Sequence, residues 1–181
     1  LWNRIIYKSY SLDREDIIID KILGNKKKGF YIDVGAYDPS RINNTKRFYD
    51  RGWFGINVEP SKENHNKFVL SRERDINLNL GIGNQNSQIK FYKFIPDTLS
   101  TFYTKEKLKY SKLGHKFLGT EFIDVRKLSY ILNKYCPMKK IDFLSIDTEG
   151  YDFEVLKSND WKKFRPKVIC IETATYRGFK S

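Results

Sequence analysis

The sequence predicts an α/β fold in which helices cover both faces of a mostly parallel, doubly wound sheet. Apolar runs of strand length recur along the chain with helix-sized gaps between them, and each run is rich in β-branched or aromatic residues. Near-continuous apolar strands that alternate with helices are typical of a parallel sheet buried on both faces. Right-handed crossover connections then give a doubly wound sheet. The five runs are residues 30–34, 53–58, 76–80, 141–146 and 168–171.

Helices are predicted in the gaps between these strands. The clearest spans residues 125–135, where apolar side chains fall on one face. Asp124 stands at its N-cap position, and Pro137 is expected to end it. Weaker patterns predict three further short helices, at residues 40–50, 62–70 and 152–156.

One segment departs from this alternation of strands and helices. Alternation in residues 88–94 predicts an antiparallel strand, and the polar stretch that follows lacks a strong period. We expect an irregular insertion at residues 95–121, either a binding loop or a mobile surface loop. Residues 1–28 are expected to form an N-terminal helical segment. A length of 181 residues favours a single domain spanning residues 1–181.

Composition restricts the setting of the protein. No stretch approaches the about 18 to 20 apolar residues of a membrane span, and the N-terminus lacks the layout of a secretory signal. Cys136 and Cys170 are too few for a disulfide framework, which favours a reducing compartment and a cytoplasmic location. The net charge of +12 would attract anionic partners, namely nucleic acid, nucleotide-linked sugars or a membrane surface, unless the lysines are simply solvated.

The most informative segment is GFYIDVGAYDP at residues 29–39. A buried strand ends here with Asp33 directed at a ligand, and the small residues Gly35 and Ala36 form a turn that a ligand can approach closely. A simple structural turn would also explain Gly35. The segment lacks both the dinucleotide glycine spacing and the Gly-Lys-Ser/Thr of a phosphate loop, so a nucleoside without a pyrophosphate on this turn, such as an aminoacyl nucleoside sulfonium, fits best.

Two further strand ends carry acidic residues. Glu59 lies 24 residues after Gly35, near the spacing of about 20 at which such folds place a ribose-binding acid, although a solvated carboxylate is the alternative. Asp147 and Glu149 follow the strand at residues 141–146. They could orient an amino group, bind a divalent ion or take a proton from a substrate hydroxyl, or one of them could cap a helix.

Three segments, in this order, resemble the core motifs of the FkbM family of S-adenosylmethionine-dependent O-methyltransferases. They are residues 29–61, 76–92 and 141–172, and the LSTF sequence at residues 99–102 is also similar. The resemblance implies a Rossmann-like sheet of the class I methyltransferase type, S-adenosylmethionine as cofactor, and methylation of a hydroxyl on a sugar, glycan or sugar-bearing metabolite.

The resemblance also assigns roles by position. Asp147 and Glu149 match the motif near the reacting centre, and we expect one of them to polarise or deprotonate the acceptor hydroxyl, with or without a divalent ion. The expected cofactor-binding residues are Asp33, Gly35, Ala36 and Asp38 in the turn, Glu59 at the ribose, Asn79 and Gly81 beside the adenine, and Asp147.

Some features depart from the family. Asp38 and Pro39 stand where many members carry a second small or glycine-containing step, and neither His65 nor His115 lies in a family motif. The family's C-terminal strands are absent, so an end at Ser181 is consistent with a truncated or partly ordered product.

Three hypotheses of function fit these features of the sequence, the first being a sugar O-methyltransferase. The positive charge favours an anionic small-molecule or glycan acceptor. An RNA methyltransferase is an alternative, because Lys and Tyr residues interleave at residues 103–117. A non-catalytic nucleoside-binding module is the other.

Overall fold

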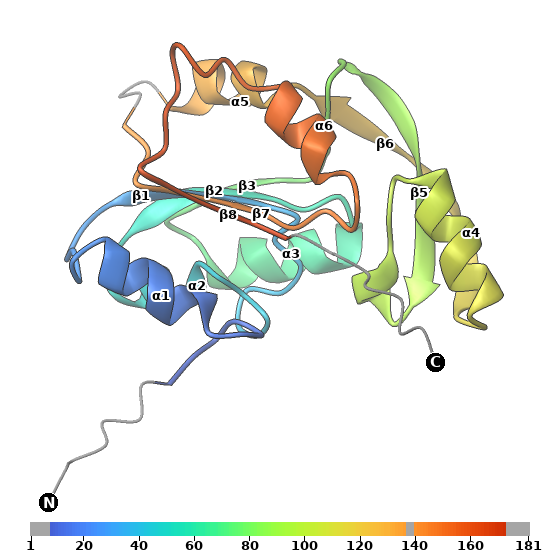
Figure 1. Cartoon of the computed structure of the whole chain (residues 1–181), viewed down its shortest axis with the longest axis horizontal. Helices are drawn as coiled ribbons and strands as arrows, with labels where there is room; N and C mark the ends of the chain where they lie inside the picture. Colours follow the sequence, from blue (N-terminus) through green and yellow to red (C-terminus); the bar gives the residue numbers. More distant parts are fainter. Residues whose placement is uncertain (1–7, 137–139, 173–181) are drawn as a thin grey trace, which may run out of the picture.

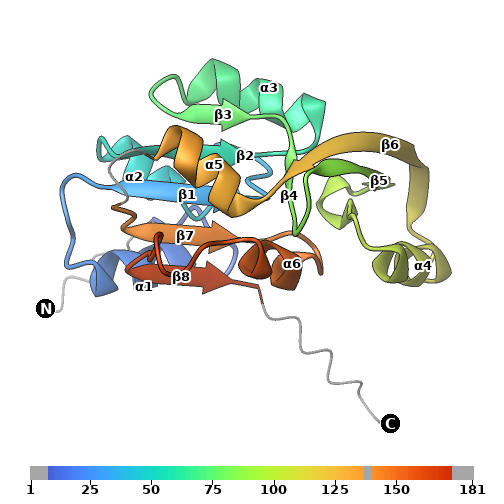
Figure 2. The same ribbon diagram turned by 90° about the horizontal axis from the view of Figure 1, so that it is seen from above.

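A five-stranded parallel sheet forms the centre of the computed structural model, which describes residues 8–136 and 140–172. Its strands lie in the order β3-β2-β1-β7-β8, and Figure 2 shows them as neighbouring rows. This confirms the predicted α/β fold, and each of the five apolar runs contains one strand: β1 (Phe30–Val34), β2 (Phe54–Val58), β3 (Ile76–Leu78), β7 (Phe143–Ile146) and β8 (Val168–Ile171).

Helices cover both faces of the sheet (Figure 1). On one face, α5 (Leu128–Tyr135) and α6 (Asp152–Lys157) pack on the side chains of Ile32 and Val34 from β1. On the other face, Tyr31 of β1 packs with residues of α1 (Glu15–Ile22) and α2 (Lys46–Asp50). α3 (Lys62–Ser71) covers the same face nearer β3 (Figure 1). Alternate residues of β1 therefore face opposite helical layers.

A second sheet of three strands stands beyond the carboxyl ends of the central strands (Figures 1 and 2). β5 (Ser87–Ile95) and β6 (Lys116–Arg126) pair in antiparallel fashion, which confirms the strand predicted at residues 88–94. The short β4 (Gly81–Ile82) pairs with β6. The apolar run at residues 76–80 therefore contains β3 of the central sheet and the two residues that connect it to β4 of the second sheet.

The prediction of an irregular insertion at residues 95–121 is wrong. This region contains a 3-10 turn η1 (Asp97–Leu99), helix α4 (Thr104–Lys112) and the first half of β6. The sequence gives little sign of β6 because its apolar residues Phe117, Leu118 and Phe122 are exposed, and the apolar side chains that pack inward, Ile123 and Val125, stand near its end.

The predicted start of the helix at residues 125–135 is also wrong. Asp124 is not its N-cap, since Val125 pairs with Ser87 in the β5–β6 ladder and is fully buried there. The helix begins at Leu128, whose backbone N–H donates to Ser158 Oγ at 3.0 Å. Because this cap comes from a distant segment, no local sequence signal marks it.

The other predicted helices are found with adjusted bounds. The helix expected at residues 40–50 begins only at Lys46, because Ile42 has a positive φ of 49° and turns the chain. α3 and α6 match the helices expected at 62–70 and 152–156. The N-terminal segment contains α1, whereas residues 1–7, Pro137 and Ser181 lie outside the described residues. Among the residues described, none of the helices is long and apolar enough to cross a membrane.

Candidate functional site

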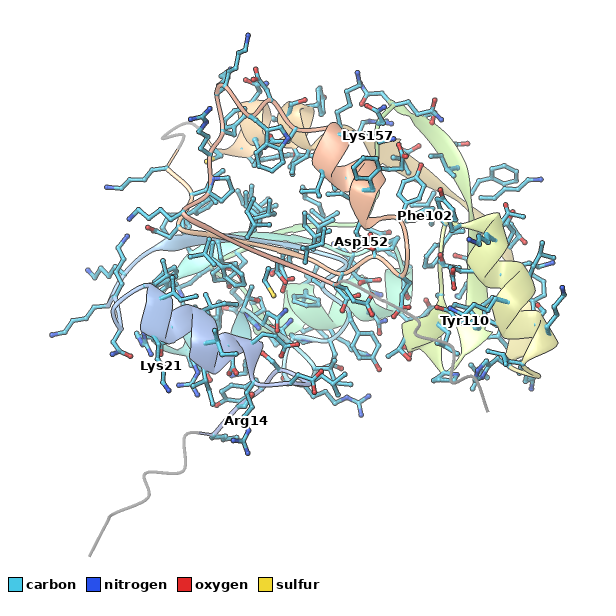
Figure 3. The ribbon with its side chains drawn as sticks, in the orientation of Figure 1. Arg14, Lys21, Phe102, Tyr110, Asp152 and Lys157 are labelled. Atoms are coloured by element: carbon cyan, nitrogen blue, oxygen red, sulfur yellow. The ribbon has the colours of Figure 1, made fainter. Side chains whose placement is uncertain are left out.

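A cavity of about 490 Å³ lies between the carboxyl edge of the central sheet and the second sheet. One wall is formed by residues at the ends of the central strands, including Gly35 after β1, Glu59 after β2 and Asp147 after β7. The opposite wall is formed by β5, η1 and Phe102. Figure 3 shows Phe102 and Tyr110 in the region between the central sheet and the outer elements β5, β6 and α4. The cavity has the size of sites that bind small molecules.

The turn after β1 depends on glycine at position 35. Gly35 has a φ of 77°, and its N–H and that of Ala36 donate to the carbonyl of Val58 at 3.0 and 3.1 Å. A Cβ atom at Gly35 would lie 1.7 Å from the backbone oxygen of Asp147. Only glycine therefore lets the turns after β1 and β7 approach each other at the cavity wall.

Asp33 differs from its expected position facing a ligand. Asp33 stands two residues after Tyr31 in β1, so its side chain points to the same face of the sheet, toward α1 and α2. Asp33 is not among the described residues that line the cavity. Its Oδ2 accepts hydrogen bonds from Thr45 Oγ1 at 2.9 Å and from Asn43 Nδ2 at 3.3 Å. Burial raises the pKa of Asp33 to about 6, against the opposing effect of these donors. Asp33 fixes the segment that follows the turn.

A Thr45→Val variant tests this supporting role. It keeps the side-chain shape but removes a donor from the buried Asp33 carboxylate, so we expect the free energy of unfolding to fall by about 1–3 kcal/mol. Urea unfolding measures the change. Thr104→Val, whose hydroxyl meets Tyr92 at an exposed site, is the matched control and should change stability by less than about 0.5 kcal/mol. Equal effects of the two substitutions would contradict the role of Asp33.

Three other predicted cofactor residues also lie outside the described lining of the cavity. Ala36 is buried, and Asp38 accepts the N–H of Ser40 at 3.0 Å. Asn79 donates from Nδ2 to the carbonyls of Glu59 and Pro60, both at 2.9 Å. These residues shape the turn and the end of β2. By contrast Gly81, the remaining residue expected beside the adenine, lines the cavity.

Glu59 presents a fixed carboxylate at the end of β2. Its Oε2 accepts the N–H of Tyr37 at 2.8 Å, and its Oε1 accepts the N–H of Ser61 at 2.7 Å. Burial raises the pKa of Glu59 to about 8, although both backbone donors favour the ionised form. Each carboxylate oxygen has a further lone pair. The side chain is therefore held in place and can still accept hydrogen bonds from a ligand in the cavity.

Asp147 and Glu149 come together with a third acid, Glu172. Each offers a carboxylate oxygen within 4.8 Å of the others, which is a ligand type that divalent cations use. Desolvation is the main cause that raises the pKa of Asp147 to about 8 and of Glu149 to about 7, and the neighbouring acids add to it. Solvent still reaches Asp147 and Glu172 through the cavity. Crowded carboxyls of this kind can accept protons near neutral pH.

Glu172 was missed by the sequence reasoning, although a signal existed. It is the first residue after β8, in the segment VICIE. Ile171 pairs with Ile146 of β7, so the residues that follow these two strands are neighbours at the sheet edge. The signal was an acidic residue directly after a predicted strand. The position of Glu172 beside the end of β7 depends on the order of the strands in the sheet, which the sequence did not reveal.

The loop that carries Glu149 is held by the segment between β5 and β6. Glu149 has a positive φ of 51°, and its carbonyl accepts a hydrogen bond from Thr101 Oγ1 at 2.9 Å. Tyr110 of α4 donates its hydroxyl to Glu149 Oε2 at 3.1 Å. Backbone N–H groups of Thr148 and Gly150 bond instead to the Asp152 carboxylate. The N-cap residue of α6 is Tyr151, so Glu149 does not cap this helix, and the Asp152 carboxylate fixes the loop that precedes it.

A Tyr110→Phe variant should raise the pKa of Glu149 above 7, because the hydrogen bond from the tyrosine lowers it. We also expect a loss of about 1 kcal/mol in the free energy of unfolding at neutral pH. The side-chain carboxyl carbon of Glu149, followed by NMR over a pH series, measures the first effect. Tyr92→Phe removes a hydroxyl that bonds at an exposed site and is the control. A Glu149 pKa that is the same in wild type and Tyr110→Phe would contradict this contact.

The cavity acids also make stability depend on pH. Glu59, Asp147 and Glu149 have pKa values of about 8, about 8 and about 7, whereas an unfolded chain would return them to near 4. The folded chain holds more protons between these limits, so the free energy of unfolding should fall as the pH rises from about 4.5 to about 8. Urea unfolding at several pH values should give a fall of at least about 1.4 kcal/mol, equivalent to one pKa unit at one group. A stability that rises over this window would contradict the assigned burial.

Comparison with known proteins places this site in a family. The sequence matches the family model described as "Methyltransferase FkbM domain" over residues 33–180 of the 181-residue chain. No curated protein and no solved structure matches it. The matched region begins in β1 and includes the end of every central strand that lines the cavity, and the five-stranded parallel sheet is consistent with a Rossmann-like methyltransferase fold. The chain belongs to the FkbM methyltransferase family.

Proposed function

We propose that the chain transfers the methyl group of S-adenosylmethionine to a hydroxyl of a sugar, a glycan or a sugar-bearing metabolite. One observation carries this proposal. A single cavity contains both the fixed carboxylate of Glu59 after β2 and the carboxyls of Asp147 and Glu149 after β7, on the other side of β1. The carboxylate of Glu59 is suited to binding the hydroxyls of a nucleoside, and the carboxyls of Asp147 and Glu149 are suited to accepting a proton.

The cofactor would lie along the carboxyl edge of the central sheet, where open α/β sheets bind their ligands. Glu59 would accept hydrogen bonds from the ribose hydroxyls, and Leu80 and Gly81 would lie beside the adenine. Gly35 would let the aminoacyl part approach the backbone. Asp33, Ala36, Asp38 and Asn79 would act indirectly, by holding the turn and the end of β2.

Bound S-adenosylmethionine supplies an electrophilic methyl group, so the protein has to align the acceptor and take up its proton. Asp147 and Glu149 are the candidates for that proton, since pKa values of about 8 and about 7 leave a part of each group ionised near neutral pH, and this ionised part can accept the proton and release it afterwards. The contact from Tyr110 fixes the carboxylate of Glu149 for this purpose. A divalent ion on the same acids is not required for this role.

The RNA alternative receives little support from the residues that suggested it. Tyr110 is buried and bonds to Glu149, so it does not offer its ring to a base. Tyr103 is partly exposed but packs edge-on against Tyr151. RNA is therefore retained as a comparison in the test and not as a second proposal.

The test is a transfer assay with methyl-labelled S-adenosylmethionine and a panel of sugars, glycosides and short RNAs. We expect labelled sugar products, and a loss of transfer of at least about 100-fold in Asp147→Asn or Glu149→Gln with cofactor binding retained. Glu63→Gln changes another cavity acid, one whose carboxylate pairs with Lys93, and is the control.

Other outcomes would decide against parts of the proposal. Loss of cofactor binding in Asp147→Asn and Glu149→Gln would remove their assignment as proton acceptors. Cofactor binding without transfer to any acceptor would favour the non-catalytic nucleoside-binding module. Label on RNA alone would replace the sugar acceptor.

A further inference from the structure

The charges that line the cavity oppose those of the chain as a whole. Although the chain carries a net charge of +12, six carboxyl side chains line the cavity and the described lining contains one basic side chain, Lys93. The six are Glu59, Glu63, Asp97, Asp147, Glu149 and Glu172.

Lys93 does not compensate for these acids. Its Nζ lies 3.1 Å from Glu63 Oε1 and 3.1 Å from Glu121 Oε1, so two carboxylates already share its charge. The lysines of α4 and the start of β6 are not among the described residues that line the cavity. The positive charge of this part of the molecule therefore lies on its outer surface, where it does not face a bound acceptor.

The acids are densest at the end of the cavity where methyl transfer would occur. Asp147, Glu149 and Glu172 each offer a carboxylate oxygen within 4.8 Å of the others, and the charge of Glu172 raises the pKa of both Asp147 and Glu149. A further anion placed here would add to this repulsion, whereas a cation would relieve it. A neutral group would meet carboxyls that can accept its hydrogen bonds.

The opposite wall suits a ring that has both apolar and hydroxyl groups. Phe91, Phe94 and Phe102 present buried aromatic surface, and Leu118 extends it. Thr98 and Ser100 place hydroxyls on the same wall, and Ser100 Oγ already accepts the N–H of Phe94 at 3.1 Å, which leaves its proton for a ligand. Sparse polar groups on an apolar wall give orientation and specificity to small ligands.

We propose that the acceptor is an uncharged or amine-bearing polyol, and that the cavity rejects acceptors whose phosphate or carboxylate would enter it. This inference rests on the proposed function, and it replaces the anionic acceptor that the net charge favoured. The charge of the whole chain governs how partners approach the surface, whereas the acids of the cavity govern what enters.

The first part of the experiment compares two adenosyl ligands that differ in charge at the reacting position. S-adenosylhomocysteine is neutral there, and sinefungin carries an amino group in place of the methyl group. Calorimetry should show sinefungin binding at least about tenfold more tightly. The ratio should shrink in a Glu149→Gln, Glu172→Gln double variant and stay unchanged in Glu73→Gln, an exposed acid outside the cavity lining. Sinefungin that binds no more tightly than S-adenosylhomocysteine would overturn the proposal.

The second part compares three sugars that differ only at carbon 6. Methyl glucoside, its 6-amino-6-deoxy analogue and methyl glucuronide are tested against the chain loaded with S-adenosylhomocysteine, by saturation-transfer NMR, with EDTA and again with MgCl₂. We expect the neutral and amino sugars to bind at least about tenfold more tightly than the glucuronide in both conditions. Binding of none of the sugars, a preference for the glucuronide, or glucuronide binding that appears only with Mg²⁺ would overturn the proposal.

The two parts separate this inference from the function on which it rests. If neither adenosyl ligand binds, the proposed function fails, and the sugar series repeated on the unloaded chain still measures the charge preference of the cavity. If S-adenosylhomocysteine binds and the charge order is reversed, the function stands and the acceptor class is wrong.

Discussion

Replacing Glu59 by glutamine should weaken the binding of S-adenosylmethionine by about 100-fold or more. Glutamine has the same shape, but its amide NH₂ would face the N–H of either Tyr37 or Ser61, both of which now donate to the carboxylate. The titration is made at pH 9, above the Glu59 pKa of about 8, where glutamine would also lose the charged acceptor for the ribose. Hydrogen bonds to charged groups contribute about 1.5–3 kcal/mol each, and the loss of two corresponds to a factor of about 100 or more.

Calorimetric titration of wild type and Glu59→Gln measures this effect. Glu63→Gln provides the matched control, because it makes the same chemical change to an exposed acid of the same cavity and should alter affinity by less than about fivefold. Thermal unfolding of both variants checks that each is folded. Binding by folded Glu59→Gln at wild-type affinity would show that the ribose does not meet this carboxylate.

Replacing Gly35 by alanine should cost more than about 3 kcal/mol of folding stability. Part of this cost is the φ of 77°, which disfavours any side chain by about 1–2 kcal/mol. The rest follows from the overlap of the new Cβ with the Asp147 carbonyl oxygen, since the two atoms would be 1.7 Å apart. Relief requires the turns after β1 and β7 to separate, which would also deform the cavity wall.

Gly24→Ala isolates the backbone part of this cost. Gly24 has a similar φ of 65°, but a Cβ there would meet nothing within 4 Å. We expect urea unfolding to give a loss of about 1 kcal/mol for Gly24→Ala and at least about 2 kcal/mol more for Gly35→Ala. Equal losses for the two variants would mean that the close approach of Gly35 to Asp147 does not exist in solution.

The central sheet could be predicted because its strands are buried on both faces. Residues 30–34 and 143–146 are buried at every position, which gives the continuous apolar runs from which strands were inferred. β6 could not be predicted in the same way, since most of its residues are exposed and its pairing with β5 depends on contacts distant in sequence. The start of α5 was likewise set by Ser158.

The site residues could be predicted where each one directly follows a strand of the central sheet, because the end of the strand then fixes its position. Gly35, Glu59 and Asp147 each follow a central strand, and all three line one cavity. Asp33 was misplaced because it lies within β1, so the alternation of side chains turns it toward Thr45. Contacts from the segment between β5 and β6, such as that of Tyr110 of α4 with Glu149, join segments 39 residues apart and left no sign in the sequence.

The most direct test of the central claim is a crystal structure of the chain with S-adenosylhomocysteine. We predict that the ribose hydroxyls bond to the carboxylate of Glu59, and that the homocysteine sulfur lies at the end of the cavity where Asp147, Glu149 and Glu172 meet. A ligand bound outside this cavity, or bound in it with the ribose away from Glu59, would contradict the proposed cofactor site and the methyl transfer assigned to it.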